Sequence, residues 1–160
     1  MNLREKLVKA EACKSGIKYY LDNQEKIDKM IASGKILVNN QNEYDNFSWA
    51  IDEKIIKVKE LKYEDSDGSW SKATYDKNSS KIKYKSSTGY WNKWTYDKNG
   101  NEIKYEKSDG YWSKSTYDKN GNQVKYEKSD GYWGKTTYNK NGNQIKFEDS
   151  DGYSKEFTHG

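Results

Sequence analysis

The segment from Tyr105 to Tyr126, which reads YEKSDGYWSKSTYDKNGNQVKY, decides the fold of this chain. Its residues alternate between charged side chains and aromatic, aliphatic or small ones, a period of two that is typical of β-strands. Two turn-forming groups interrupt the alternation, Ser-Asp-Gly at 108–110 and Asn-Gly at 120–121. Asn-Gly between such runs is the strongest short hairpin signal. The segment therefore predicts antiparallel strands joined by tight turns.

The same pattern recurs every 21 residues from about residue 61 to the end of the chain, which identifies a repeat protein. Because the period is odd, equivalent side chains share a face only if one of the two connections in each repeat has an odd number of residues. We therefore predict a two-residue Asn-Gly turn and a three-residue Ser-Asp-Gly loop. The Gly of that loop is expected in the left-handed conformation of a bulge.

This register makes specific predictions about which residues lie opposite each other. Aromatic and aliphatic residues meet on one face, and opposite charges meet on the other. The predicted pairs are Tyr117 with Val124, Ser115 with Tyr126, Lys114 with Glu127, Lys93 with Glu106 and Lys135 with Glu148. The first repeat departs from the pattern, because Lys72 would lie opposite Lys85.

The register also predicts two chemically different sheet faces. One face carries the rows Tyr75/Tyr96/Tyr117/Tyr138, Ile82/Ile103/Val124/Ile145, Tyr84/Tyr105/Tyr126/Phe147 and Tyr90/Tyr111/Tyr132/Tyr153. The other carries Trp70, Trp91, Trp112 and Trp133 among Lys, Glu, Thr and Ser. We expect an elongated single layer with Trp residues ~10 Å apart. Even a 20-residue helix spans only ~30 Å, which is too short to cover the whole sheet. The apolar face must therefore curl upon itself, dimerise or meet a partner.

Residues 1–60 have a different pattern and are predicted to form a small helical or mixed segment before the repeat sheet of residues 61–160. We predict two short helices, the first interrupted at Ser15-Gly16 and the second capped by Asp22 with Glu25 and ended by Gly34. A short strand over 36–38 and a loop over 39–42 follow. Next come an aromatic cluster of Tyr44, Phe47, Trp49 and Ile51 and a strand over 54–60. The predicted fold class is α+β, mainly β.

The composition favours an ordered, water-soluble chain. Charged residues make up 34% of the sequence, yet the net charge is only +4, and 15 Tyr and 6 Trp supply the apolar surface that aliphatic residues usually supply. No apolar run approaches the length of a membrane span, and the first residues contain no stretch resembling a signal peptide. We therefore expect a cytoplasmic protein that does not enter a membrane.

The sequence contains few of the residues that catalysis and metal binding usually require. A single cysteine, Cys13, excludes an internal disulfide and a cysteine zinc cluster, and the one histidine, His159, stands next to the last residue. Cys13 is interpreted as a small buried or half-buried residue. The loop from Asp118 to Asn122 is similar to a calcium loop, but its Gly comes too early, so a hairpin turn is the better interpretation. We predict no enzyme activity, no metal and no cofactor.

The motif Tyr-Asp-Lys-Asn-Gly-Asn followed by Ser-Asp-Gly-Tyr-Trp resembles the tyrosine-aspartate (YD, or RHS) repeats of bacterial proteins and, more loosely, MORN hairpin arrays. The resemblance covers residues 61–158 and implies rows of hairpins in a curling sheet without catalytic residues. Such arrays behind a short helical segment also resemble small phage-encoded proteins. The repeat length is similar to that of choline-type cell-wall-binding repeats, whose ligand cages use more than one aromatic residue.

The Trp row is the predicted contact surface, because one large aromatic side chain per repeat stands on a charged face. The candidate partner-binding residues are Trp70, Trp91, Trp94, Trp112, Trp133, Lys93, Lys114 and Lys135. The alternative interpretation is that each Trp covers neighbouring lysine stems. With Arg4 as the single arginine, nucleic-acid binding is expected to be weak or to occur through a partner.

Two functions are predicted from this surface. The first is a non-catalytic protein that binds a macromolecule, most plausibly a protein, for example as a phage-type inhibitor of a defence enzyme such as a CRISPR nuclease. The alternative is a carbohydrate or cell-wall binding module. A homo-oligomer formed through the apolar sheet face is a further expectation.

Overall fold

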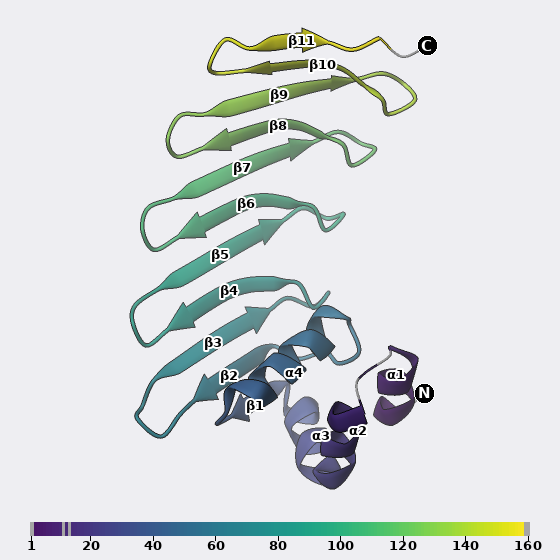
Figure 1. Cartoon of the computed structure of the whole chain (residues 1–160), viewed down its shortest axis with the longest axis vertical. Helices are drawn as coiled ribbons and strands as arrows, with labels where there is room; N and C mark the ends of the chain where they lie inside the picture. Colours follow the sequence, from purple (N-terminus) through teal and green to yellow (C-terminus); the bar gives the residue numbers. More distant parts are fainter. Residues whose placement is uncertain (1, 11, 13, 159–160) are drawn as a thin grey trace. The chain divides into compact units, whose positions relative to one another are not determined.

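The structure, a computed structural model, describes residues 2–10, 12 and 14–158; Cys13 and His159 lie outside the described residues. The described residues form four helices and eleven strands, with the helices and β1 in the N-terminal part and the other ten strands after α4 (Figure 1). The predicted fold class, α+β and mainly β, is therefore confirmed. The chain forms two compact units, Met1–Tyr90 and Trp91–Gly160. We call them unit 1 and unit 2.

Unit 1 contains the helices and the first four strands. The helices are α1 (Leu3–Lys9), α2 (Lys14–Asp22), α3 (Gln24–Ser33) and α4 (Gln41–Asp52). The strands are β1 (Lys35–Val38), β2 (Glu60–Glu64), β3 (Trp70–Tyr75) and β4 (Lys81–Ser86), and they lie side by side in chain order. β1 pairs parallel to β2, and the following pairs are antiparallel.

The predicted helical region is confirmed in outline and corrected in detail. Gly34, with φ of 72°, ends α3 as predicted, because glycine adopts the left-handed conformation without steric penalty. Gly16 lies inside α2 and does not interrupt it. The predicted Asp22 cap is wrong: Asp22 is the last residue of α2, where it pairs with Lys18 at 2.7 Å, and α3 follows Asn23.

Residues 41–52 form α4, so the predicted loop over 39–42 holds only for 39–40 and the predicted strand over 54–60 is wrong. Tyr44, Phe47 and Ile51 of the predicted aromatic cluster do pack in one core, but they lie on a helix. Asn40 caps this helix, and its side-chain oxygen accepts the Glu43 backbone N–H at 2.9 Å. Tyr44, Phe47 and Ile51 recur at intervals of three and four residues and are all buried. The strand that follows begins at Glu60.

The core of unit 1 forms where α4 packs against β1 and β2 (Figure 1). Ile51 of α4, Leu61 of β2 and Ala73 of β3 are each 0% exposed, and Tyr75 is 3% exposed. Ile36 and Val38 of β1 join the same cluster. The helices thus cover the side of the sheet that carries the first members of the predicted Tyr and Ile rows.

Unit 2 contains seven strands of the repeat. They are β5 (Trp91–Tyr96), β6 (Glu102–Lys107), β7 (Trp112–Tyr117), β8 (Gln123–Lys128), β9 (Trp133–Tyr138), β10 (Gln144–Asp149) and β11 (Ser154–Glu156). Each pairs antiparallel with the next. The predicted three-residue Ser108-Asp109-Gly110 loop is confirmed: Lys107 donates its N–H to the Tyr111 carbonyl at 2.9 Å, and Gly110 has φ of 90°.

The predicted two-residue Asn-Gly turn is wrong. Asp118 donates its N–H to the Asn122 carbonyl at 2.9 Å, so three residues form this loop as well. The Asp118 side chain favours the wider loop because its Oδ1 accepts the N–H groups of Asn120 and Asn122 at 2.8 and 2.9 Å.

A β-bulge restores the register that the odd period requires. Tyr117 lies opposite Gln123 and Thr116 opposite Lys125, so Val124 is an extra, unpaired residue. The predicted Tyr117–Val124 pair is therefore wrong. Beyond the bulge, the predicted pairs are confirmed: Lys114 with Glu127, Ser115 with Tyr126, Lys93 with Glu106, Lys135 with Glu148 and Lys72 with Lys85. Ile82, Ile103 and Ile145 are the extra residues of the equivalent bulges.

Candidate functional site

The register gives the sheet two distinct faces, because directly opposed residues on antiparallel strands point to the same side. We call the side that carries Trp112, Lys114 and Glu127 the charged face, and the side that carries Tyr105 and Ser113 the tyrosine face. The same division holds in unit 1. There, Glu64, Trp70 and Lys72 lie on the charged face, and Leu61, Tyr63 and Ala73 lie on the tyrosine face.

The structure places most of the predicted site residues on the charged face. In unit 2 these are Trp91, Trp112, Trp133, Lys93, Lys114 and Lys135, and in unit 1 the charged face carries Trp70. Trp94 is not among them. It lies opposite Tyr105 on the tyrosine face, and the two ring centroids are 5.4 Å apart.

The ion pairs of the charged face run mainly along single strands. Lys104 and Glu106 are 2.7 Å apart, whereas the cross-strand pair of Lys93 and Glu106 is 3.8 Å apart. The hydrogen bond from Lys104 lowers the pKa of Glu106 below its usual value. The same pairing recurs in Lys125–Glu127 and Lys146–Glu148. Lys104, Lys125 and Lys146 therefore each have a carboxylate next to them.

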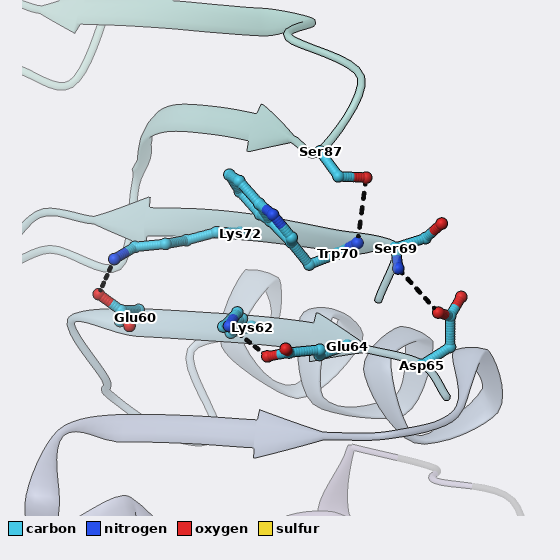
Figure 2. Close-up of polar contacts among 8 residues, drawn as sticks. All are labelled: Glu60, Lys62, Glu64, Asp65, Ser69, Trp70, Lys72 and Ser87. Atoms are coloured by element: carbon cyan, nitrogen blue, oxygen red, sulfur yellow. Dashed lines mark hydrogen bonds and ion pairs between the residues drawn. The ribbon is translucent and has the colours of Figure 1, made fainter. Parts of the chain in front are cut away.

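The Trp side chains of this face lie against lysines. The Lys114 ammonium is 4.9 Å from the centre of the Trp112 ring, and that of Lys62 is 6.0 Å from Trp70. Figure 2 shows the surroundings of Trp70, where Lys72 pairs with Glu60 and Lys62 pairs with Glu64. The contacts at Trp70 and Trp112 agree with the interpretation that Trp covers lysine stems on a solvated surface.

The tyrosine face of unit 2 carries a ladder of aromatic rings. Tyr105 and Tyr111 meet edge to face with centroids 6.2 Å apart, and the Lys107 ammonium lies 5.9 and 4.9 Å from their centres. The next repeat has the same arrangement. There, the Lys128 ammonium lies 5.4 Å from Tyr126 and 5.0 Å from Tyr132.

Small side chains lie between the rings of the tyrosine face. Tyr105 lies opposite Ser113, and Tyr126 lies opposite both Ser115 and Gly134. A small hollow of about 110 Å³ opens at Gly134. It is lined by Gln123, Lys125, Tyr126, Tyr132, Gly134, Thr136 and Phe147. The regular register adds few charges to this face: Lys107, Lys128, Asp149 and Lys155.

Two phenols of this face, those of Tyr126 and Tyr132, have a raised pKa. Burial, followed by the nearby Tyr111 hydroxyl, raises the pKa of Tyr126 to about 12. The pKa of Tyr132 is raised by burial and then by the carboxylates of Asp149 and Asp151. Neutral hydroxyl groups can both donate and accept hydrogen bonds, so each ring offers an apolar body with a polar tip.

The tyrosine faces of the two units differ in exposure. In unit 1, Ala73 is 0% and Tyr75 is 3% exposed. Their equivalents in unit 2, Ser115 and Tyr117, are half-buried. Residues at the same repeat position are thus buried in a protein core in unit 1 and accessible to solvent in unit 2.

A second hollow lies among the helices of unit 1. It has a volume of about 520 Å³, and its walls are mainly apolar. They include Leu7, Tyr20, Ile27, Phe47 and Trp49. The residues that line it place no carboxylate, lysine or histidine in its wall, so its chemistry does not identify a ligand.

Neither a metal site nor a membrane span is found in the part of the chain that the structure describes. No group of His, Cys, Asp and Glu side chains there is arranged to hold a metal ion, and no helix there is long and apolar enough to cross a membrane. The Asp118 carboxylate of the loop similar to a calcium loop accepts N–H groups of its own loop.

Comparison with protein-family models and with curated proteins gives no match. None of the protein-family models matches the chain, and no curated protein is significantly similar to it. The resemblance to YD and MORN repeats therefore remains a prediction about turn chemistry, while the β-hairpin repeat itself is observed.

Proposed function

We propose that this chain is a non-catalytic binding protein that engages a protein partner through the tyrosine face of unit 2. Protein-binding surfaces are rich in Tyr and Trp and poor in charge, and small polar residues such as Ser, Asn and Gly complement the rings. The tyrosine face has this composition, with Trp94, Tyr105 and Tyr126 among small residues such as Ser113 and Gly134.

The observation that carries the proposal is the difference in exposure at one repeat position. Tyr75 is buried in the core of unit 1, in which α4 packs on the sheet, whereas its equivalent Tyr117 is half-buried. A row of side chains that forms a protein core in one unit has the right chemistry to pack against protein in the other. Each aromatic side chain removed from water contributes roughly 1.5–3 kcal/mol.

Two adjacent threonines provide a matched test. Thr136 lies opposite Phe147 on the tyrosine face, and Thr137 lies opposite Lys146 on the charged face. A pull-down compares Thr136→Glu with Thr137→Glu after both are shown to fold. We expect Thr136→Glu to lose the partner and Thr137→Glu to retain it. The reverse result would move the site to the charged face, as would loss of the partner in the triple variant Trp91→Ser, Trp112→Ser and Trp133→Ser.

Carbohydrate binding at the Trp row is the second candidate function. The observation in its favour is that Trp91 and Trp112 are half-buried and Trp133 is 36% exposed, one per repeat on a single face. Titration with cell-wall polysaccharide should then quench Trp fluorescence in the wild type and in Thr136→Glu but not in the triple Trp variant. An unchanged spectrum removes this candidate.

The resemblance to small phage-encoded proteins makes the proposal more specific. The partner would then be a bacterial defence enzyme such as a CRISPR nuclease, held in an inactive state. Inhibition of DNA cleavage by the purified protein tests this version, and a second copy of the chain as partner is tested by its mass in solution.

A further inference from the structure

The tyrosine face of unit 1 already holds a helix. Tyr44 of α4 meets Tyr63 of β2 with ring centroids 6.4 Å apart, and Phe47 and Ile51 of the same helix are buried in the same core as Leu61. The sheet residues of this site are Leu61, Tyr63, Ser71, Ala73 and Tyr75. We call this set the helix seat.

The repeat carries the helix seat into unit 2 twice. Two periods along the chain, the equivalent residues are Ile103, Tyr105, Ser113, Ser115 and Tyr117, and three periods along they are Val124, Tyr126, Gly134, Thr136 and Tyr138. The pairing of Tyr63 with Ser71 is reproduced by Tyr105 with Ser113 and by Tyr126 with Gly134. Each copy therefore has the same tyrosine walls and a floor of small residues.

One copy of the seat is filled by its own side chain. Trp94 stands at the position of Ala73, one period along, and its ring packs on Tyr105 with centroids 5.4 Å apart. The repeat therefore tolerates a Trp at this position. The two later copies have the smaller residues Ser115 and Thr136 there, so no large side chain occupies that position.

We propose that the partner presents an amphipathic helix to a seat of unit 2, packed as α4 is packed on β2. This inference rests on the proposed function. Twelve residues of helix, the length of α4, span ~18 Å, about the length of a six-residue strand. Because α4 runs along β2 (Figure 1), a helix packed in the same way covers one seat, on β6 and β7 or on β8 and β9. In the second of these seats, the Phe147 ring lies over Gly134 beside the hollow of about 110 Å³.

The charges of the tyrosine face predict which residues stand beside the apolar stripe of that helix. Lys107, Lys128 and Lys155 are the cations that the register places there, and Lys107 and Lys128 are each held over two tyrosine rings. A docked helix with acidic residues beside its apolar stripe complements the ammonium group at the seat that it occupies. α4 has this composition, with Glu43 and Asp45 beside Tyr44 and Phe47.

The probe for the experiment is a synthetic peptide with the sequence of residues 40–53, added to the full-length, isotope-labelled protein. Amide chemical shifts report where it binds. We expect shifts confined to the seats of unit 2, at residues 103–117 and 124–138, with weak affinity because an isolated helix of this length is marginal in water.

Matched variants test the geometry of binding. Ser115→Trp fills the floor as Trp94 does, and it should weaken peptide binding to the seat on β6 and β7 at least tenfold. Thr116→Trp adds the same ring on the charged face, since Thr116 lies opposite Lys125, and it should change binding less than twofold. Lys128→Glu should weaken binding to the seat on β8 and β9 at low salt. Spectra of the free variants establish that each remains folded.

The outcomes separate this inference from the proposed function. Shifts in unit 1, or equal effects of Ser115→Trp and Thr116→Trp, overturn the helix inference. Absence of shifts at millimolar peptide overturns it as well, and so does a partner that docks through a strand, a glycan or a second copy of the sheet. In those cases, loss of the partner in Thr136→Glu alone would still uphold the tyrosine face as the binding surface.

Discussion

Replacing Tyr75 and Tyr117 by alanine, one at a time, tests whether the helices seal the tyrosine face of unit 1. The two tyrosines occupy the same repeat position, so side chain, strand and neighbouring loop are matched. Tyr75 is 3% exposed in the core of unit 1, whereas Tyr117 is half-buried, and its hydroxyl donates to the Glu102 carbonyl at 3.1 Å.

The difference in burial sets the expected magnitudes. A fully buried aromatic ring removes about 150–250 Å² from water, and aromatic-to-alanine substitutions in cores cost about 3–5 kcal/mol. We therefore expect Tyr75→Ala to lower the free energy of unfolding by about 4 kcal/mol. Tyr117 is less buried than Tyr75 and has one exposed hydrogen bond. For Tyr117→Ala we therefore expect a smaller loss, about 2–3 kcal/mol.

Urea denaturation followed by Trp fluorescence and by far-ultraviolet circular dichroism measures both changes. Circular dichroism at helical wavelengths should show that Tyr75→Ala releases the helices at lower urea, while Tyr117→Ala leaves the helical transition in place. Losses that agree within about 0.5 kcal/mol, the usual limit for independent sites, would refute the assignment of α4 to this face.

Three further predictions concern the loops. Asp118→Ala should destabilise unit 2 in urea because two loop N–H groups lose their acceptor, and Asp118→Asn should cost less, since Asn139 makes the equivalent bonds at 2.9 and 3.0 Å. Hydrogen bonds from the Asn122 side chain and the loop N–H groups lower the pKa of Asp118. The ionised Asp118 carboxylate therefore contributes its full stabilisation of the fold above the unfolded pKa of ~3.9, and this contribution is lost as the pH falls through the lower folded pKa. Acid denaturation of Asp118→Asn should be less steep than that of the wild type, because the amide does not titrate. Ser79 has φ of 64° where later repeats have Gly, so Ser79→Gly should raise the unfolding free energy by about 1 kcal/mol; a lower melting temperature would contradict this.

The repeat architecture could be predicted because its signals are local. Alternation in 105–126 fixes the strands, and the glycines that follow Asp109 and Asn120 place the loops but do not give the length of the second loop. Pairs such as Lys114 with Glu127 are correct although the two-residue turn that predicted them is wrong, because the bulge at Val124 compensates for the extra loop residue. These features depend on side-chain alternation and backbone conformation, both of which are properties of a few neighbouring residues.

The sequence alone could not decide between the two faces as the binding surface, because exposure depends on contacts between distant segments. The Trp row was chosen for its regularity, yet Lys114 lies against Trp112. Comparing the charge of the two predicted faces would have favoured the tyrosine face instead. The helical spacing of Tyr44, Phe47 and Ile51 was the signal for α4 that the interpretation as an aromatic cluster overlooked.

By itself, the sequence determined that this chain folds into hairpins with its tyrosines on one side, because a period of two within a period of 21 leaves no other way to keep the rows together. Tertiary structure alone decided how the register is restored and where the tyrosine face is buried. The Asp118 side chain selects the wider loop and a bulge compensates for it. Packing of residues 41–52 on β2 buries Leu61 and Tyr75, because a helix forms most favourably where a complementary apolar surface is available.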